Sequence, residues 1–142
     1  MKRLPTLKSA PRGFTLIELM VVVAVIAVIA LIAYPSFVEQ LRRSRRSDAS
    51  AALQRLQLAQ ERFRASNTSY GATPAAVGES ATSQSSYYAL SFSGVSATGY
   101  TATATAQGAQ AGDGKCAKLT LTFAGGAATR GSSPSDPSVC WK

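Results

Sequence analysis

The sequence contains no histidine and only two cysteines, Cys116 and Cys140, both near the C-terminus. It has no CxxC motif, Cys/His cluster, paired-carboxylate motif or phosphate-binding glycine loop. The usual signatures of a zinc site, of general acid–base catalysis and of nucleotide chemistry are therefore missing, and no evident base activates the many serines. We expect a protein that is not an enzyme and that uses no cofactor and no metal.

Apolar residues are scarce outside one segment, residues 14–38, and the rest of the chain is rich in Ala, Ser, Thr and Gly. Residues 19–38 contain no charge, and these 20 residues are about what an α-helix needs to cross a hydrocarbon layer of roughly 30 Å. A basic leader, residues 1–13, precedes this run, whereas a secretory signal peptide is cleaved after its apolar run. We therefore predict a membrane-spanning helix that survives removal of the leader at Gly13.

Charge does not orient this span, because four bases precede it and four arginines follow it between Arg42 and Arg46. The cysteines do orient it. A disulfide between Cys116 and Cys140 needs an oxidising compartment, and it would stabilise a small domain by roughly 3 to 3.5 kcal/mol. We therefore place the leader in the cytoplasm and the C-terminal region in the periplasm of a bacterium, with a single pass through the inner membrane.

Glu18 is the only charged residue within residues 14–38. A carboxylate inside a bilayer costs roughly 2.5 to 3.5 kcal/mol, so it needs a partner or a purpose. Cleavage after Gly13 would give Phe14 a free amino group about one helical turn away, and the two charges could pair within one chain or between packed chains. The alternative is a solvated acid at headgroup depth, favoured by the helix dipole.

The segment from Gly13 to Met20, GFTLIELM, resembles the processing motif of type IV prepilins and pseudopilins. The resemblance implies that a prepilin peptidase cuts between Gly13 and Phe14 and methylates the new amine of Phe14. It also implies that Glu18 guides assembly by meeting the N-terminus of a neighbouring subunit, and that the inner-membrane assembly machinery transfers the subunit into an extracellular pilus.

A second helical segment follows the span. Pro35 removes one backbone donor and should kink the helix. Beyond it, apolar residues recur three or four positions apart as far as Phe63, which predicts an amphipathic stem helix over residues 39–66. The arginine run 42–46 would meet anionic headgroups or acids of other subunits, or else form a solvated helix face.

Three later runs alternate apolar and polar residues: 88–93, 100–106 and 119–123. Their short, glycine-containing links favour consecutive antiparallel pairing. The tail, residues 125–142, is too irregular to hold itself by ladder hydrogen bonds, and the disulfide would pin it. We therefore predict an α+β fold in which the long helix packs on an antiparallel sheet of three to four strands, residues 67–142 forming the globular head.

The head is similar to those of the smaller type IV pilins, including PilE-like minor pilins and the related competence pilins. The segments YY, YTATATA, KCAKLTLTF and CW carry this resemblance. It implies a structural subunit of a type IV pilus, a minor pilin that polymerises with other pilin subunits and serves pilus assembly, twitching motility or adhesion.

Two alternatives remain open. A competence pilin would bind DNA, with cations near the cystine meeting phosphates and an aromatic ring stacking on bases. Its candidate residues are Lys115, Lys118, Arg130, Trp141 and Lys142, and a scattered basic surface is the competing interpretation. A pseudopilin of type II secretion would share the N-terminus and would bind calcium through Asp113 or Asp136, although the cysteine pair favours a pilus.

Overall fold

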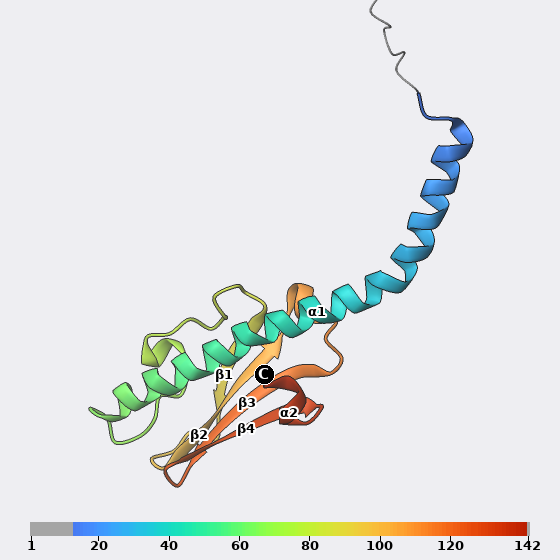
Figure 1. The fold of residues 1–142 in the computed structure, drawn as a ribbon. Helices are drawn as coiled ribbons and strands as arrows, with labels where there is room; N and C mark the ends of the chain where they lie inside the picture. Colours follow the sequence, from blue (N-terminus) through green and yellow to red (C-terminus); the bar gives the residue numbers. More distant parts are fainter. Residues whose placement is uncertain (1–12, 142) are drawn as a thin grey trace, which may run out of the picture. The chain divides into compact units, whose positions relative to one another are not determined.

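The chain divides into two compact units, Met1–Phe37 and Val38–Lys142, of which the computed structural model describes residues 13–141. One helix, α1 (Leu16–Arg64), contributes to both units and is followed by a four-stranded sheet and a short C-terminal helix (Figure 1). The predicted α+β pilin-like class is confirmed. The stem helix ends at Arg64, two residues before the predicted boundary.

The described part of the first unit is the apolar half of α1. All its side chains are exposed, and the most apolar 18-residue window has a mean hydropathy of 3.1. A helix that is apolar on every side is stable only inside a membrane or among other apolar helices. The helix is long and apolar enough to cross a membrane. Pro35 lies inside it, and the kink there remains a prediction.

The second unit contains a sheet whose strands follow the chain: β1 (Tyr88–Ser93), β2 (Gly99–Ala106), β3 (Cys116–Ala124) and β4 (Ala127–Pro134). Neighbouring strands pair antiparallel in the order β1-β2-β3-β4. The first three strands match the three alternating runs, so the meander is confirmed.

Strand β4 is the fourth strand for which the predicted sheet of three to four strands left room, but it lies in the tail, residues 125–142, and the expectation that the tail is too irregular for ladder hydrogen bonds is wrong. Ala124 pairs with Ala127 across a two-residue turn in which Gly125 and Gly126 both have positive φ. This is the geometry that a tight hairpin of antiparallel strands requires. The strand escaped prediction because it is an edge strand of small, mostly exposed residues with no apolar alternation.

The core lies between one stripe of α1 and one face of the sheet. Ala49, Ala52, Leu53 and Leu56 are buried on the helix, at the three- and four-residue spacing of an amphipathic helix. The sheet contributes the alternate residues Tyr88, Leu90, Tyr100, Ala102, Ala104, Leu119 and Leu121. Tyr70 closes one end of this core, with its ring centroid 4.9 Å from that of Tyr100.

The C-terminal segment is attached to the sheet by a cystine and by hydrogen bonds. The predicted disulfide joins Cys116, at the start of β3, to Cys140 in helix α2 (Pro137–Cys140). Asp136 accepts a hydrogen bond from the backbone N–H of Ser138 and so caps α2. The core, the sheet and the cystine all lie within residues 38–142, so this unit has the elements of an independently folding domain.

Leu53 and Leu58 lie on opposite sides of the stem helix and test this packing. Leu53 is fully buried, whereas Leu58 is 52% exposed. In urea unfolding of the fragment 38–142, we expect Leu53→Ala to lower the free energy of unfolding by about 2–5 kcal/mol, because it leaves a cavity in the core. Leu58→Ala should change it by no more than about 0.5 kcal/mol. Equal effects would contradict the assigned packing face.

Candidate assembly segment and nucleic-acid interface

The junction at Gly13 and Phe14 lies just before α1. The backbone N–H of Glu18 donates to the hydroxyl of Thr15 at 3.2 Å. Thr15 and Glu18 therefore stand in the Thr-x-x-Glu pattern of a helix N-terminus, a signal in the sequence that the prediction overlooked. The structure places Glu18 in the first turn of α1, and its pairing with another subunit remains a prediction.

Glycine at position 13 has no packing role in the structure. A Cβ atom built there would meet nothing within 4 Å among the residues that the structure describes. The fold therefore tolerates a larger residue at this position. Any requirement for glycine here must come from whatever recognises the junction.

Arg46 does not belong to a solvated face, so that interpretation of the arginine run is wrong for this residue. It is only 2% exposed, and its Nε and Nη2 atoms lie 2.7 and 2.8 Å from the two carboxylate oxygens of Asp113. Its Nη2 also lies 3.4 Å from Glu39. The stem therefore holds the β2–β3 connection through a bidentate, charge-assisted contact.

Gln110 completes this buried site. Its Nε2 donates to Asp113 Oδ2 at 2.9 Å, to the carbonyl of Arg42 at 3.1 Å and to the hydroxyl of Tyr88 at 3.1 Å. Burial raises the pKa of Tyr88 to about 12, so its hydroxyl stays neutral. The site thus connects the stem, strand β1 and the β2–β3 connection.

The carboxyl group of Asp113 is held ionised. Burial alone would raise its pKa, but the hydrogen bonds and charge of Arg46, together with backbone N–H groups of Cys116 and Lys115, hold its pKa below the usual value. Both of its oxygens are engaged, and Asp136 caps α2. Among residues 13–141 no group of three metal-ligating side chains gathers. The expectation that Asp113 or Asp136 binds calcium therefore has no support.

The candidate DNA-binding residues are divided between the two faces of the sheet. Arg130 pairs in register with the buried Leu121, and its guanidinium lies 5.2 Å from the ring centre of Trp141. The indole N–H of Trp141 donates to the carbonyl of Gly131 at 2.8 Å. Lys118 lies on the opposite face, because its register partners Thr105 and Ser133 belong to that side.

Lys115 is placed at one end of the sheet. It immediately precedes β3, its Nζ lies 3.4 Å from Glu39, and its side chain is 60% exposed. Lys142 lies outside the described residues. The four candidates that the structure describes thus do not form one patch.

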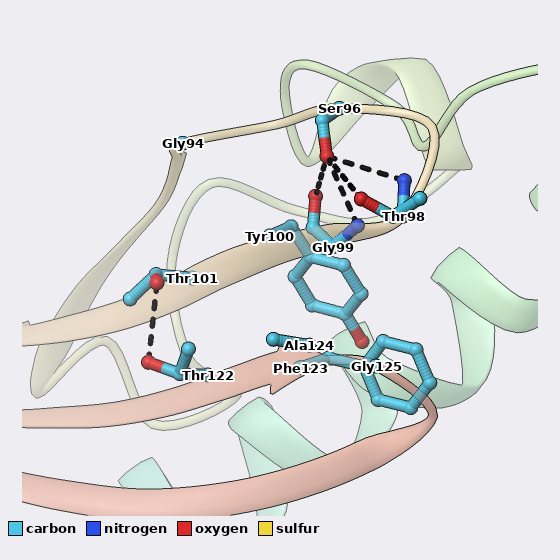
Figure 2. A pocket seen from close by; sticks show the side chains of 10 residues that line it. All are labelled: Gly94, Ser96, Thr98, Gly99, Tyr100, Thr101, Thr122, Phe123, Ala124 and Gly125. Atoms are coloured by element: carbon cyan, nitrogen blue, oxygen red, sulfur yellow. Dashed lines mark hydrogen bonds between the residues drawn. The ribbon is translucent and has the colours of Figure 1, made fainter.

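The outer face of the sheet, on which Lys118 lies, also carries threonine hydroxyl groups further along the strands. Thr101 and Thr122 approach each other there at 3.1 Å, and a hollow of about 220 Å³ opens near the β1–β2 turn (Figure 2). Inside that turn, Ser96 Oγ accepts from the backbone N–H groups of Thr98 and Gly99. No charged side chain is among the residues that line the hollow, and the hydroxyls of Ser96 and Thr98 form hydrogen bonds within the turn.

An apolar helix followed by a stem on an antiparallel sheet with a C-terminal cystine defines a type IV pilin-like protein. A family model described as "Type IV minor pilin ComP, DNA uptake sequence receptor" matches residues 35–120. A model of the prokaryotic N-terminal methylation motif matches residues 8–34. No curated protein matches the chain. Because the first match covers more than half of the sequence, the chain belongs to the ComP family of type IV minor pilins.

The chain is therefore a structural pilus subunit. The methylation motif implies processing by a prepilin peptidase and assembly with other pilins, and the apolar helix fits a membrane-anchored precursor. Of the candidate DNA-binding residues, Lys115 and Lys118 lie within the family match, whereas Arg130, Trp141 and Lys142 lie beyond it.

The lowered pKa of Asp113 sets the expected pH dependence of stability. A carboxyl whose pKa is lower in the folded state stabilises the fold above its unfolded pKa, and that contribution disappears as pH falls through the folded pKa. Asp113→Asn removes the bidentate partner of the buried Arg46 and leaves it only the longer contact to Glu39, so we expect it to cost about 3–5 kcal/mol at pH 7 and to remove part of the loss on acidification. Urea titrations of the fragment 38–142 at pH 7 and pH 3 measure both effects.

The matched control is Glu61→Gln, which removes one negative charge from an exposed position on the same stem. It should change neither the stability at pH 7 nor the acid dependence by more than about 0.5 kcal/mol. If Asp113→Asn behaved like this control, the ion pair would not hold the head together.

Proposed function

We propose that this minor pilin binds DNA during uptake while its apolar helix holds it in the pilus. The observation that carries the proposal is the match of residues 35–120 to a family described as a DNA uptake sequence receptor. The charge balance supports it. The sequence from residue 14 onward contains 11 Lys and Arg against 7 Asp and Glu, which favours a polyanionic partner.

We assign the DNA-binding surface to the edge of the sheet around β4. Arg130 lies on β4 and Lys118 on the neighbouring strand β3, on opposite faces of the sheet, so a phosphate backbone running along the edge can be reached from both sides. Ser133, the register partner of Lys118 on β4, adds a hydroxyl group of the kind that donates to phosphate oxygens. The ring of Trp141 lies beside Arg130 and is available for stacking on a base, and Lys142 is the next residue in the sequence. We assign Lys115 a smaller part in DNA binding, because Glu39 partly neutralises its charge.

We also propose that the N-terminal segment directs assembly of the subunit into the pilus. Prepilin peptidase cleaves between Gly13 and Phe14 and methylates Phe14, and Glu18 then pairs with the amine of a neighbouring subunit. The exposure of Phe14 and the position of Glu18 in the first helical turn support these roles. Before assembly the head occupies the periplasm, where its cystine can form, and the inner-membrane machinery then moves the subunit into the pilus.

The DNA contacts predict a characteristic salt dependence. In gel shifts with the fragment 38–142, Lys118→Gln combined with Arg130→Gln should weaken retention of DNA of any sequence. Each lost phosphate contact should reduce the slope of log K against log salt by about 0.9. The control Arg55→Gln with Arg62→Gln removes the same charge from exposed positions on α1. Equal losses in both double variants, or no salt-sensitive retention by the unaltered fragment, would rule out this surface.

The assembly roles predict two separable defects. Gly13→Leu should leave the leader attached, because the peptidase site is blocked while the fold has room for the larger side chain. Glu18→Ala should be processed normally but be absent from sheared filaments. Mass spectrometry of the N-terminus and quantification of the subunit in the filament fraction measure the two steps. Normal cleavage in the first variant and normal incorporation of the second would contradict both assignments.

A further inference from the structure

Arg42 and Arg43 of the stem have no acidic partner among the described residues, in contrast to their neighbours Arg45 and Arg46, which contact groups of the head. Arg45 donates a hydrogen bond to the carbonyl of Ala109 at 3.2 Å, and its guanidinium carbon lies 4.7 Å from the ring centre of Tyr87. Arg46 forms the buried ion pair with Asp113. Among residues 13–141, no carboxylate lies within salt-bridge distance of the guanidinium groups of Arg42 and Arg43. Arg43 is exposed and Arg42 is half-buried.

The fold brings a third cation to the same end of the second unit. Lys115 belongs to the β2–β3 connection, far along the chain, yet its Nζ lies 3.4 Å from Glu39 on the stem. The guanidinium of Arg42 lies against the same connection, because a Cβ built on Gly112 would be 2.9 Å from its Nη2. Arg42, Arg43 and Lys115 are called the stem-base cations below.

Their place along the helix fixes their distance from the apolar run. Val38 is the last residue of the uncharged segment, and α1 continues without a break as far as Arg64. At a rise of 1.5 Å per residue, Arg42 and Arg43 lie about 6 to 8 Å beyond Val38. The headgroup layer on each side of a bilayer has about this thickness, since the whole bilayer exceeds its hydrocarbon core by roughly 10 to 15 Å.

We propose that the stem-base cations bind anionic phospholipid headgroups of the leaflet from which α1 emerges, and that this seats the head on the membrane before assembly. Guanidinium groups hydrogen-bond phosphate in a bidentate geometry, and basic residues beside a span are attracted to anionic lipid surfaces. A lipid partner also gives a role to Arg42 and Arg43, which have no carboxylate within salt-bridge distance in the described part of the chain, while Glu39 neutralises Lys115 only in part. The proposal is independent of DNA binding at the β4 edge.

Vesicle flotation with the fragment 38–142 tests the proposal, because this unit holds its own core and cystine. The probes are vesicles of phosphatidylcholine alone and of phosphatidylcholine with 30% phosphatidylglycerol, a composition chosen for the assay. The unaltered fragment should float only with the anionic vesicles, and less at high salt. Arg42→Gln with Arg43→Gln should lower the partition coefficient roughly 25-fold, at about fivefold for each base.

Two matched controls separate this surface from general charge and from the DNA site. Arg55→Gln with Arg62→Gln removes the same charge further along α1, and Lys118→Gln with Arg130→Gln alters the proposed DNA surface. Both should stay within about twofold of the unaltered fragment, and urea midpoints should confirm that all variants are folded. These results together would support the proposal.

Three outcomes would overturn it. Equal losses in all double variants would mean that diffuse charge, not the stem base, adsorbs to the vesicles. Equal flotation with neutral vesicles would mean that apolar contact dominates. Unchanged flotation of the Arg42→Gln/Arg43→Gln fragment, together with loss of the same full-length variant from filaments, would assign these arginines to acids of another pilin subunit.

Discussion

The buried ion pair between Arg46 and Asp113 connects parts of the head that are far apart in sequence. Asp113 accepts two hydrogen bonds from the stem and one from the backbone N–H of Cys116, at 3.3 Å. The pair therefore fixes where β3 begins, and the cystine at Cys116 then fixes the C-terminal tail. Taking two charges out of water is costly, so such a pair contributes chiefly by selecting one arrangement of the stem and the β2–β3 connection.

This internal use of charge determines which bases remain for partners. Arg46 is buried in the head and Arg45 is held at its surface by Ala109 and Tyr87, whereas Arg42 and Arg43 have no carboxylate within salt-bridge distance among the described residues. Among the described residues, the exposed bases lie on α1, at Arg43, Arg55 and Arg62, and on the β2–β3 connection and the sheet, at Lys115, Lys118 and Arg130. The same chain can thus carry an apolar segment for polymerisation and a head whose surface is free to meet polyanions.

Patterns in the sequence predicted those elements whose formation depends on residues that are close together in the chain. Uninterrupted apolar residues predicted the span, and strict alternation predicted β1 to β3. Strand β4 was missed because an exposed edge strand of small residues needs no apolar face, and its only signal was the Gly125-Gly126 turn. The burial of Arg46 was missed because its partner is 67 residues away. The separation of Lys118 from Arg130 depends on strand register, which the sequence does not specify.

The central claim is that one subunit both enters the pilus and captures DNA through its head. The most direct measurement is DNA uptake in cells whose only copy of this protein carries Lys118→Gln and Arg130→Gln, with the subunit quantified in sheared filaments. The account predicts filaments with the normal amount of the subunit and uptake reduced at least tenfold, as expected when about 1.4 kcal/mol or more of binding free energy is lost. Undiminished uptake by filaments that contain the variant would contradict it.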